Sequence, residues 1–275
     1  GAAKVNIAMR HLTVLQSILL TMLALGLQSC GTESSAPTTS PQAEPLATDT
    51  PTVDDARETV ASLEQKTNGL WRYTGLTTGD GTDLRLTGIF LFKDGLFLQQ
   101  AVFNSKPFDQ AGSMAHAGPY RAEPETRSMH LVAEQTISLD PTTANPISFT
   151  PNTDHDVTVT RADESLTLIF GMGTSTVQEF SKVGPGEGQL YRLENGALAL
   201  VDKHFILVDG SEDQVTSGYG TYEQEGESLS LQVIRWSEAD AESATNLMDV
   251  ALEATFDGQS LVLADGRAFR VSEEP

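Results

Sequence analysis

From residue 69 onward, the chain is a series of short segments rich in β-branched and aromatic residues, separated by residues that favour turns. GLWRYTGL, LTGIFLF, LFLQQAVF and SLTLIFG are four such segments, and turn signals lie at 78–81, 93–95 and 162–164. Over residues 129–137, alternate positions share one face, as they do in a strand. Many short strands joined by tight turns are typical of antiparallel sandwiches and barrels, so the pattern predicts an all-β fold.

The strand pattern occurs twice. DVTVTRADESLTL at 156–168 aligns with DVALEATFDGQSLVL at 249–263, and each is followed by a turn and a last strand. GIFLFKDGLFLQQ corresponds to GALALVDKHFILV, and GPY before one long strand corresponds to GTY before another. An internal repeat of this length indicates two copies of one structural unit. We expect two tandem antiparallel β-barrels over 68–183 and 184–275, the second one trimmed. One larger barrel built from both halves is the alternative.

A family resemblance rests on a G-x-W opening, a hairpin of the form F-x-DG-x-F and a G-x-Y that begins a meander. The residues are Gly69, Trp71, Phe92, Asp94, Gly95, Phe97, Gly118 and Tyr120. This order resembles the lipocalin-like domains of bacterial envelope lipoproteins. The resemblance implies a barrel that binds an apolar small molecule, and it carries over no catalytic residue. The second copy matches only through the repeat, since no G-x-W opens it and its hairpin has Lys203-His204 where the first copy has Gly95-Leu96.

The N-terminal segment has the layout of a secretory signal peptide. Lys4 and Arg10 precede an apolar run over residues 12–27. A membrane-spanning helix is the alternative, but it needs about 20 apolar residues, and this run is shorter and contains Gln16. We therefore interpret residues 1–29 as a signal peptide.

The sequence LQSC at 27–30 resembles the lipobox of bacterial lipoproteins, and it contains the only cysteine of the chain. The resemblance implies that Cys30 receives a diacylglyceryl thioether, that cleavage follows Ser29, and that the new amino terminus is acylated, for example by palmitate. Two or three acyl chains hold a protein on a membrane, whereas one chain anchors it marginally. In a Gram-negative envelope, Gly31 favours the outer membrane, with the protein facing the periplasm.

Two further segments lead to the first barrel. Residues 30–51 are rich in Ser, Thr and Pro with almost no large apolar residue, so they are predicted to form a disordered tether. Residues 52–67 carry apolar residues at helical spacing after Thr52, which can cap a helix, and Asp54, which suits its first turn. This segment is predicted to form one short amphipathic helix.

The charge balance excludes nucleic acid as a partner. The chain has 17 basic and 38 acidic residues. Residues 1–29 hold two of the bases and no acid, so their removal leaves 15 bases, 38 acids and a net charge of −23. Such a protein repels nucleic acid and anionic lipid head groups. We interpret the acids as a well-solvated surface.

The candidate ligand-binding residues are aromatic. Trp71 and Tyr73 lie two apart in a predicted strand and share a face, while phenylalanines surround the first hairpin. An eight-stranded barrel is either filled by its own side chains or holds one small ligand. Each aromatic taken alone suits a packed core, and the group suits a pocket. The predicted set is Trp71, Tyr73, Phe90, Phe92, Phe97 and Tyr120.

No metal, cofactor or catalytic residue is predicted. Asp154 and Asp156 would share a strand face opposite His155, which favours a solvated strand entry over a metal site. His116, His130 and His204 are scattered, without zinc spacing. Residues 209–213 begin like a calcium loop but lack its later glycine and glutamate.

We therefore expect a membrane-anchored envelope lipoprotein, without enzymatic activity, that binds a small apolar or amphipathic ligand in the first barrel. The alternative is a structural or protein-interaction module whose barrels are filled by side chains. An isomerase-like enzyme that uses a barrel pocket is a third hypothesis, with the least support.

Overall fold

The computed structural model describes residues 61–104, 107–123, 126, 128–171 and 175–273. The predicted signal peptide, Cys30, the tether and residues 52–60 lie outside these ranges. Residues 61–67 are helical, so the described part of the predicted helix is confirmed. No helix among the described residues is both long and apolar enough to cross a membrane.

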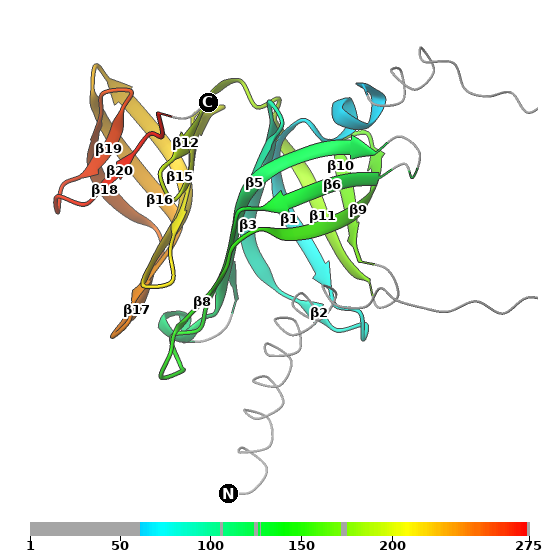
Figure 1. Ribbon diagram of the computed structural model, residues 1–275, viewed down its shortest axis with the longest axis horizontal. Helices are drawn as coiled ribbons and strands as arrows, with labels where there is room; N and C mark the ends of the chain where they lie inside the picture. The colour runs from blue at the N-terminus through cyan, green and yellow to red at the C-terminus, as the bar shows by residue number, and fades with distance from the viewer. Residues whose placement is uncertain (1–60, 105–106, 124–125, 127, 172–174, 274–275) are drawn as a thin grey trace, which may run out of the picture. The chain divides into compact units, whose positions relative to one another are not determined.

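The first barrel closes with eight antiparallel strands. Hydrogen bonding runs in the order β4-β3-β1-β11-β10-β9-β6-β5, and a β5–β4 pairing returns to the start. This closure removes the free edges that an open sheet would expose. Figure 1 shows these strands, cyan to green, curving round a common interior. The eight strands are β1 (Gly69–Thr77), β3 (Leu86–Lys93), β4 (Leu96–Phe103), β5 (Ser113–Glu123), β6 (Ser128–Ala133), β9 (Thr153–Ala162), β10 (Ser165–Phe170) and β11 (Thr176–Gly184).

Short elements extend this barrel at one end. β7 continues the chain after β6 and pairs with the first half of β5, and β8 pairs with β7. β2 pairs with the end of β1. These elements are β2 (Asp83–Leu84), β7 (Gln135–Leu139), β8 (Ile147–Thr150) and the 3₁₀ helix η2 (Phe108–Gln110).

The second barrel has the same plan. Its strands pair consecutively in the order β12-β13-β14-β15-β16-β18-β19-β20, and a bridge between Leu193 and Val271 joins the two ends. The predicted pair of barrels is therefore confirmed, and one larger barrel is excluded. The strands are β12 (Gly188–Leu193), β13 (Gly196–Val201), β14 (His204–Gly210), β15 (Gln214–Glu225), β16 (Ser228–Asp240), β18 (Val250–Phe256), β19 (Ser260–Leu263) and β20 (Ala268–Arg270), with β17 (Ala244–Leu247) paired to β16.

The repeated G-x-Y motif has one steric explanation in both barrels. A Cβ on Gly118 would lie 1.9 Å from the carbonyl oxygen of Val132, and one on Gly220 would lie 2.0 Å from that of Gln232. No side chain fits at either point, because the neighbouring strand passes too close. The glycine lets the long strand bend where it meets the next strand of the barrel.

Three buried clusters explain the most apolar segments. One lies inside the first barrel, one lies inside the second, and the third contains residues from both. In β4, Phe97 and Ala101 lie in the first cluster, while Leu98 lies in the shared one. In β13, Leu198 lies inside the second barrel and Ala199 in the shared cluster. Both faces of these strands are buried, so their sequences are continuously apolar rather than alternating.

Candidate functional site

One end of the first barrel is closed by Trp71 and the helix. The indole Nε1–H donates a 2.6 Å hydrogen bond to the carbonyl oxygen of Thr67, and Leu63 of the helix joins the barrel core. The guanidinium of Arg161 lies 5.5 Å, and the ammonium of Lys182 5.9 Å, from the centre of the indole ring. The charged side chains at this end therefore flank Trp71, which is itself fully buried.

All six aromatic residues of the predicted set lie in the core of the first barrel, between 0 and 8% exposed. The Phe90 and Phe92 rings stack with their centres 4.6 Å apart, and Tyr120 meets Phe92 edge-on at 5.2 Å. The Tyr120 hydroxyl donates a 2.7 Å hydrogen bond to Oδ1 of Asn68. A further ring outside the predicted set, that of Phe180, lies 4.4 Å from Tyr73. The set forms a packed aromatic floor, and its contact with a ligand stays a prediction.

Polar side chains lie above this floor, further along the same interior. The Tyr73 hydroxyl donates a 2.8 Å hydrogen bond to Oε1 of Gln178. Burial raises the pKa of Tyr73 above its usual range, and the Gln99 side chain, which lies close to this hydroxyl but outside hydrogen-bond geometry, offsets this in part. Gln99 is 1% exposed, and its Oε1 lies 2.5 Å from Nδ1 of His116 on the neighbouring strand. Because an amide oxygen only accepts, Nδ1 of His116 carries the proton in this arrangement.

Residues of β7 and β9 complete the polar group. His155 pairs with Leu131, a core residue, and Thr153 pairs with Ala133, so both side chains face the interior. Thr136 faces the same way, since it pairs with His116. The ring centres of His116 and His155 are 6.2 Å apart, at a near-right angle. We call Gln99, His116, Thr136, Thr153 and His155 the polar cluster.

The polar cluster is incompletely hydrogen-bonded. Four buried atoms of the cluster have no hydrogen-bond partner among the described residues: Nε2 of Gln99, Oγ1 of Thr136, Oγ1 of Thr153 and Nε2 of His155. All of these side chains except Gln99 keep some solvent exposure. Burial lowers the pKa of His116 to about 3 and also lowers that of His155, so both rings are neutral near pH 7. Unpaired buried polar groups are uncommon in folded proteins, and each needs an explanation.

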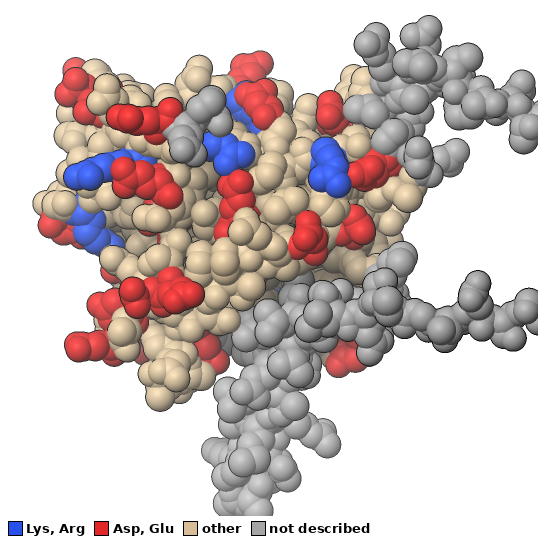
Figure 2. Space-filling model, viewed as in Figure 1, with Lys and Arg blue, Asp and Glu red and all other residues tan. Residues whose placement is uncertain are grey.

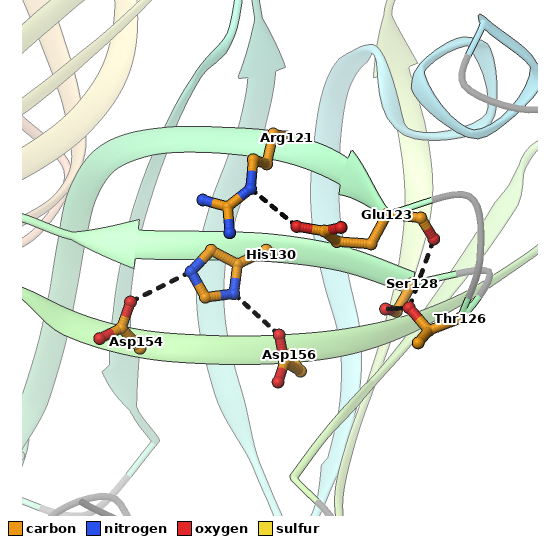
Figure 3. Close-up of polar contacts among 7 residues, drawn as sticks. All are labelled: Arg121, Glu123, Thr126, Ser128, His130, Asp154 and Asp156. Atoms are coloured by element: carbon orange, nitrogen blue, oxygen red, sulfur yellow. Dashed lines mark hydrogen bonds and ion pairs between the residues drawn. The ribbon is translucent and has the colours of Figure 1, made fainter. Parts of the chain in front are cut away.

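The two aspartates beside His155 face the outside of the barrel (Figure 3). His130 of β6 lies between them, with Nδ1 2.8 Å from Oδ1 of Asp156 and Nε2 3.1 Å from Oδ1 of Asp154. The strand alternation expected for these residues is present. Their contact with His130 was not predicted, because the β6–β9 register, not chain proximity, brings the histidine here. Within the described ranges, no group of three or more His, Cys, Asp or Glu side chains is placed to hold a metal ion.

The interior of the second barrel is apolar. Leucine, valine, phenylalanine and tryptophan side chains make up most of its core cluster. Trp236 packs against Gly218, where a Cβ would lie 2.3 Å from its ring. Its Nε1–H donates a 2.7 Å hydrogen bond to Glu238, which also pairs with Arg267 at 2.6 Å. Trp236 is among the largest fully buried side chains of the described residues, and its indole lies in this core.

A groove of about 680 Å³ lies between the β6–β7 connection of the first barrel and the start of the second. Its lining includes Glu134 and Arg192, whose side chains form a 2.8 Å ion pair. Both partners are about one-third exposed, and such pairs contribute little net stability. The groove is polar and open, which suits water better than an apolar ligand.

On the face shown in Figure 2, acidic side chains are spread out rather than gathered in one patch, and basic ones lie among them. This distribution agrees with the interpretation of the acids as a solvated surface.

Comparison with known proteins adds no relative. No family model, no curated protein and no solved structure matches this chain significantly. The barrel architecture agrees with the lipocalin-like resemblance, and any functional conclusion rests on the residues described above.

Proposed function

We propose that this protein is a lipid-anchored envelope protein that binds a small amphipathic molecule inside its first barrel. The aromatic floor, with Trp71 at the closed end, would contact the apolar part of the ligand. The polar cluster would bind its polar part near the solvent-accessible end. Pockets of this kind combine apolar walls with a few well-placed polar groups.

The observation that carries the proposal is a difference between equivalent positions of the two barrels. In the aligned hairpins, Gln99 of the first copy corresponds to Leu207 of the second. His116, two residues before the G-x-Y glycine, corresponds to Gly218, and its strand partner Thr136 corresponds to Trp236. At these positions the second barrel therefore has an indole and a leucine, where the first has polar side chains with unpaired atoms.

Replacing two residues of the first barrel with their counterparts from the second tests this proposal. The double variant H116G/T136W places the glycine and tryptophan of the second barrel into the first. Binding of the neutral apolar dye N-phenylnaphthylamine, followed by its fluorescence, is expected for the unaltered protein and is expected to be lost in the double variant. T158W is the matched control, since Thr158 is an exposed residue of β9 that faces outward. Dye binding that persists in the double variant would contradict the proposal.

Native mass spectrometry of the full chain purified from its own membrane gives an independent test. We expect a copurified small molecule that the double variant lacks. A structural or protein-interaction role is the second candidate, favoured by the stacked floor and by the apolar interior of the second barrel. Absence of both dye binding and a copurified molecule would leave that role as the better interpretation.

The anchor rests on the sequence of residues 1–31 and is tested separately. C30S is expected to release the protein from membranes into the soluble fraction. Continued sedimentation of C30S with membranes would refute lipidation at this residue, without bearing on ligand binding.

A further inference from the structure

We infer that the ligand of the first barrel carries an uncharged polar group, such as a hydroxyl or an amide, and not a carboxylate or an ammonium. This inference rests on the proposed function and adds the chemical class of the ligand. It follows from which atoms of the polar cluster are unpaired and from where the charged side chains lie.

The unpaired atoms include both donors and acceptors. The amide nitrogen of Gln99 can only donate, whereas the hydroxyls of Thr136 and Thr153 can do both. Nε2 of His155 accepts when the ring proton is on the other nitrogen. A ligand hydroxyl or amide also donates and accepts, so it could pair with several of these atoms at once. A carboxylate only accepts, and an ammonium only donates.

The polar cluster contains no charged group that could neutralise a ligand charge. Its members are amide, hydroxyl and imidazole side chains, and burial keeps the imidazoles uncharged near pH 7. Asp154 and Asp156, which flank His155 in the chain, lie on the outer face with His130 between them (Figure 3). Arg161 and Lys182 lie beside Trp71 at the closed end, beyond the aromatic floor.

Burial decides between the ligand classes. Gln99 is 1% exposed, so an ion placed against its amide would lose most of its hydration. An ion buried without a countercharge suffers a desolvation penalty that neutral hydrogen bonds do not offset. For an uncharged group of the same size this penalty is far smaller, and the group satisfies donors and acceptors that are otherwise unpaired.

The test compares three ligands that share a ten-carbon chain and differ in their polar group: decanol, decanoate and decylammonium. Their binding to the full chain is measured by isothermal titration calorimetry at pH 8, where the acid is ionised. We expect decanol to bind about 10–100-fold more tightly than either ion, a difference of about 1.4–2.8 kcal/mol in binding free energy. Decanoate or decylammonium binding as tightly as decanol would overturn the inference and leave the proposed function standing. Failure of all three to bind would overturn both.

Two variants test whether the polar cluster supplies the selectivity. Q99L replaces the amide with the residue found at the equivalent position of the second barrel and should preserve the fold. We expect it to weaken decanol binding about tenfold and to leave the weak binding of the two ions unchanged. H130L is the matched control, because His130 lies on the outer face of the same barrel. Decanol affinity unchanged in Q99L, or reduced equally in H130L, would overturn the inference.

Discussion

Because His116 is buried, we expect the protein to lose stability in acid, by an amount that follows from the pKa of this ring. The His116 ring lies inside the first barrel, and burial lowers its pKa to about 3 from an ordinary value of 6.5. Below pH 6.5 the unfolded chain takes up a proton on this ring, and the folded protein does not. The stability contributed by the neutral ring is therefore fully present above pH 6.5 and is lost as the pH falls toward 3.

The magnitude follows from the width of that interval. Each pH unit between the two pKa values is worth about 1.4 kcal/mol. Acidification from pH 6.5 to 4 should therefore lower the free energy of unfolding by about 3 kcal/mol through His116 alone. H116Q removes the titrating group and keeps an amide that can bind Gln99. The variant should lose about 3 kcal/mol less than the unaltered protein over this interval.

Urea denaturation at pH 6.5 and at pH 4 measures the difference. Carboxylates titrate in both proteins, so their contributions cancel when the variant is subtracted from the parent. His155, whose pKa is also lowered by burial, remains in both. H204Q, which replaces a histidine of the second barrel and leaves His116 in place, is the matched control. If H116Q loses stability on acidification as steeply as the parent, the reasoning from burial is refuted.

Three further predictions concern other parts of the fold. Burial, aided by the Glu194 charge, raises the pKa of Asp209 to about 6. A carboxyl with a raised pKa destabilises the folded state once it ionises. The neutral amide of D209N removes this cost, so the variant should add about 1–2 kcal/mol to the free energy of unfolding at pH 7 and nothing below pH 4. G118A should lower that free energy by about 1–3 kcal/mol in thermal unfolding, since its Cβ meets a carbonyl oxygen at 1.9 Å. W71F should speed hydrogen exchange over residues 61–67 by about fivefold, because it removes a hydrogen bond worth about 1 kcal/mol; unchanged exchange there would contradict the proposed closure.

The fold was predictable where side chains alternate and where the pattern repeats. Trp71 and Tyr73 share a face two residues apart, and the internal repeat indicates two units of the same design. The continuously apolar runs such as GIFLF and GALALV are ambiguous in sequence, because alternation disappears when both faces of a strand are buried. Only the shared cluster of the two barrels explains them. Barrel closure through β4 and β5 also depends on strand register, which the turns alone do not specify.

Of the candidate site, the aromatic floor was predictable from the sequence and the polar cluster was not. Large aromatic residues at regular positions in predicted strands indicate a barrel interior, so the residues of the floor were predicted. Gln99 and His116 are 17 residues apart and His155 is further still, and register alone makes them neighbours. The sequence does contain one signal, since LFLQQAVF places two glutamines inside an otherwise apolar strand. A polar residue at such a position is buried at a cost unless a partner is near.

The second barrel adopts the architecture of the first without a polar cluster in its interior. Both copies use the same strand order, the same hairpin and the same close approach at Gly118 and Gly220. The second copy closes around leucine, valine and tryptophan, with Leu207 where the first has Gln99. Buried polar atoms without partners lower stability, and the second barrel demonstrates an apolar solution to the same packing problem. Sequences that depart from the most stable choice usually do so at functional sites. The first barrel therefore remains the place to look for a ligand, and the polar cluster, more than the aromatic floor, is the part of it to mutate first.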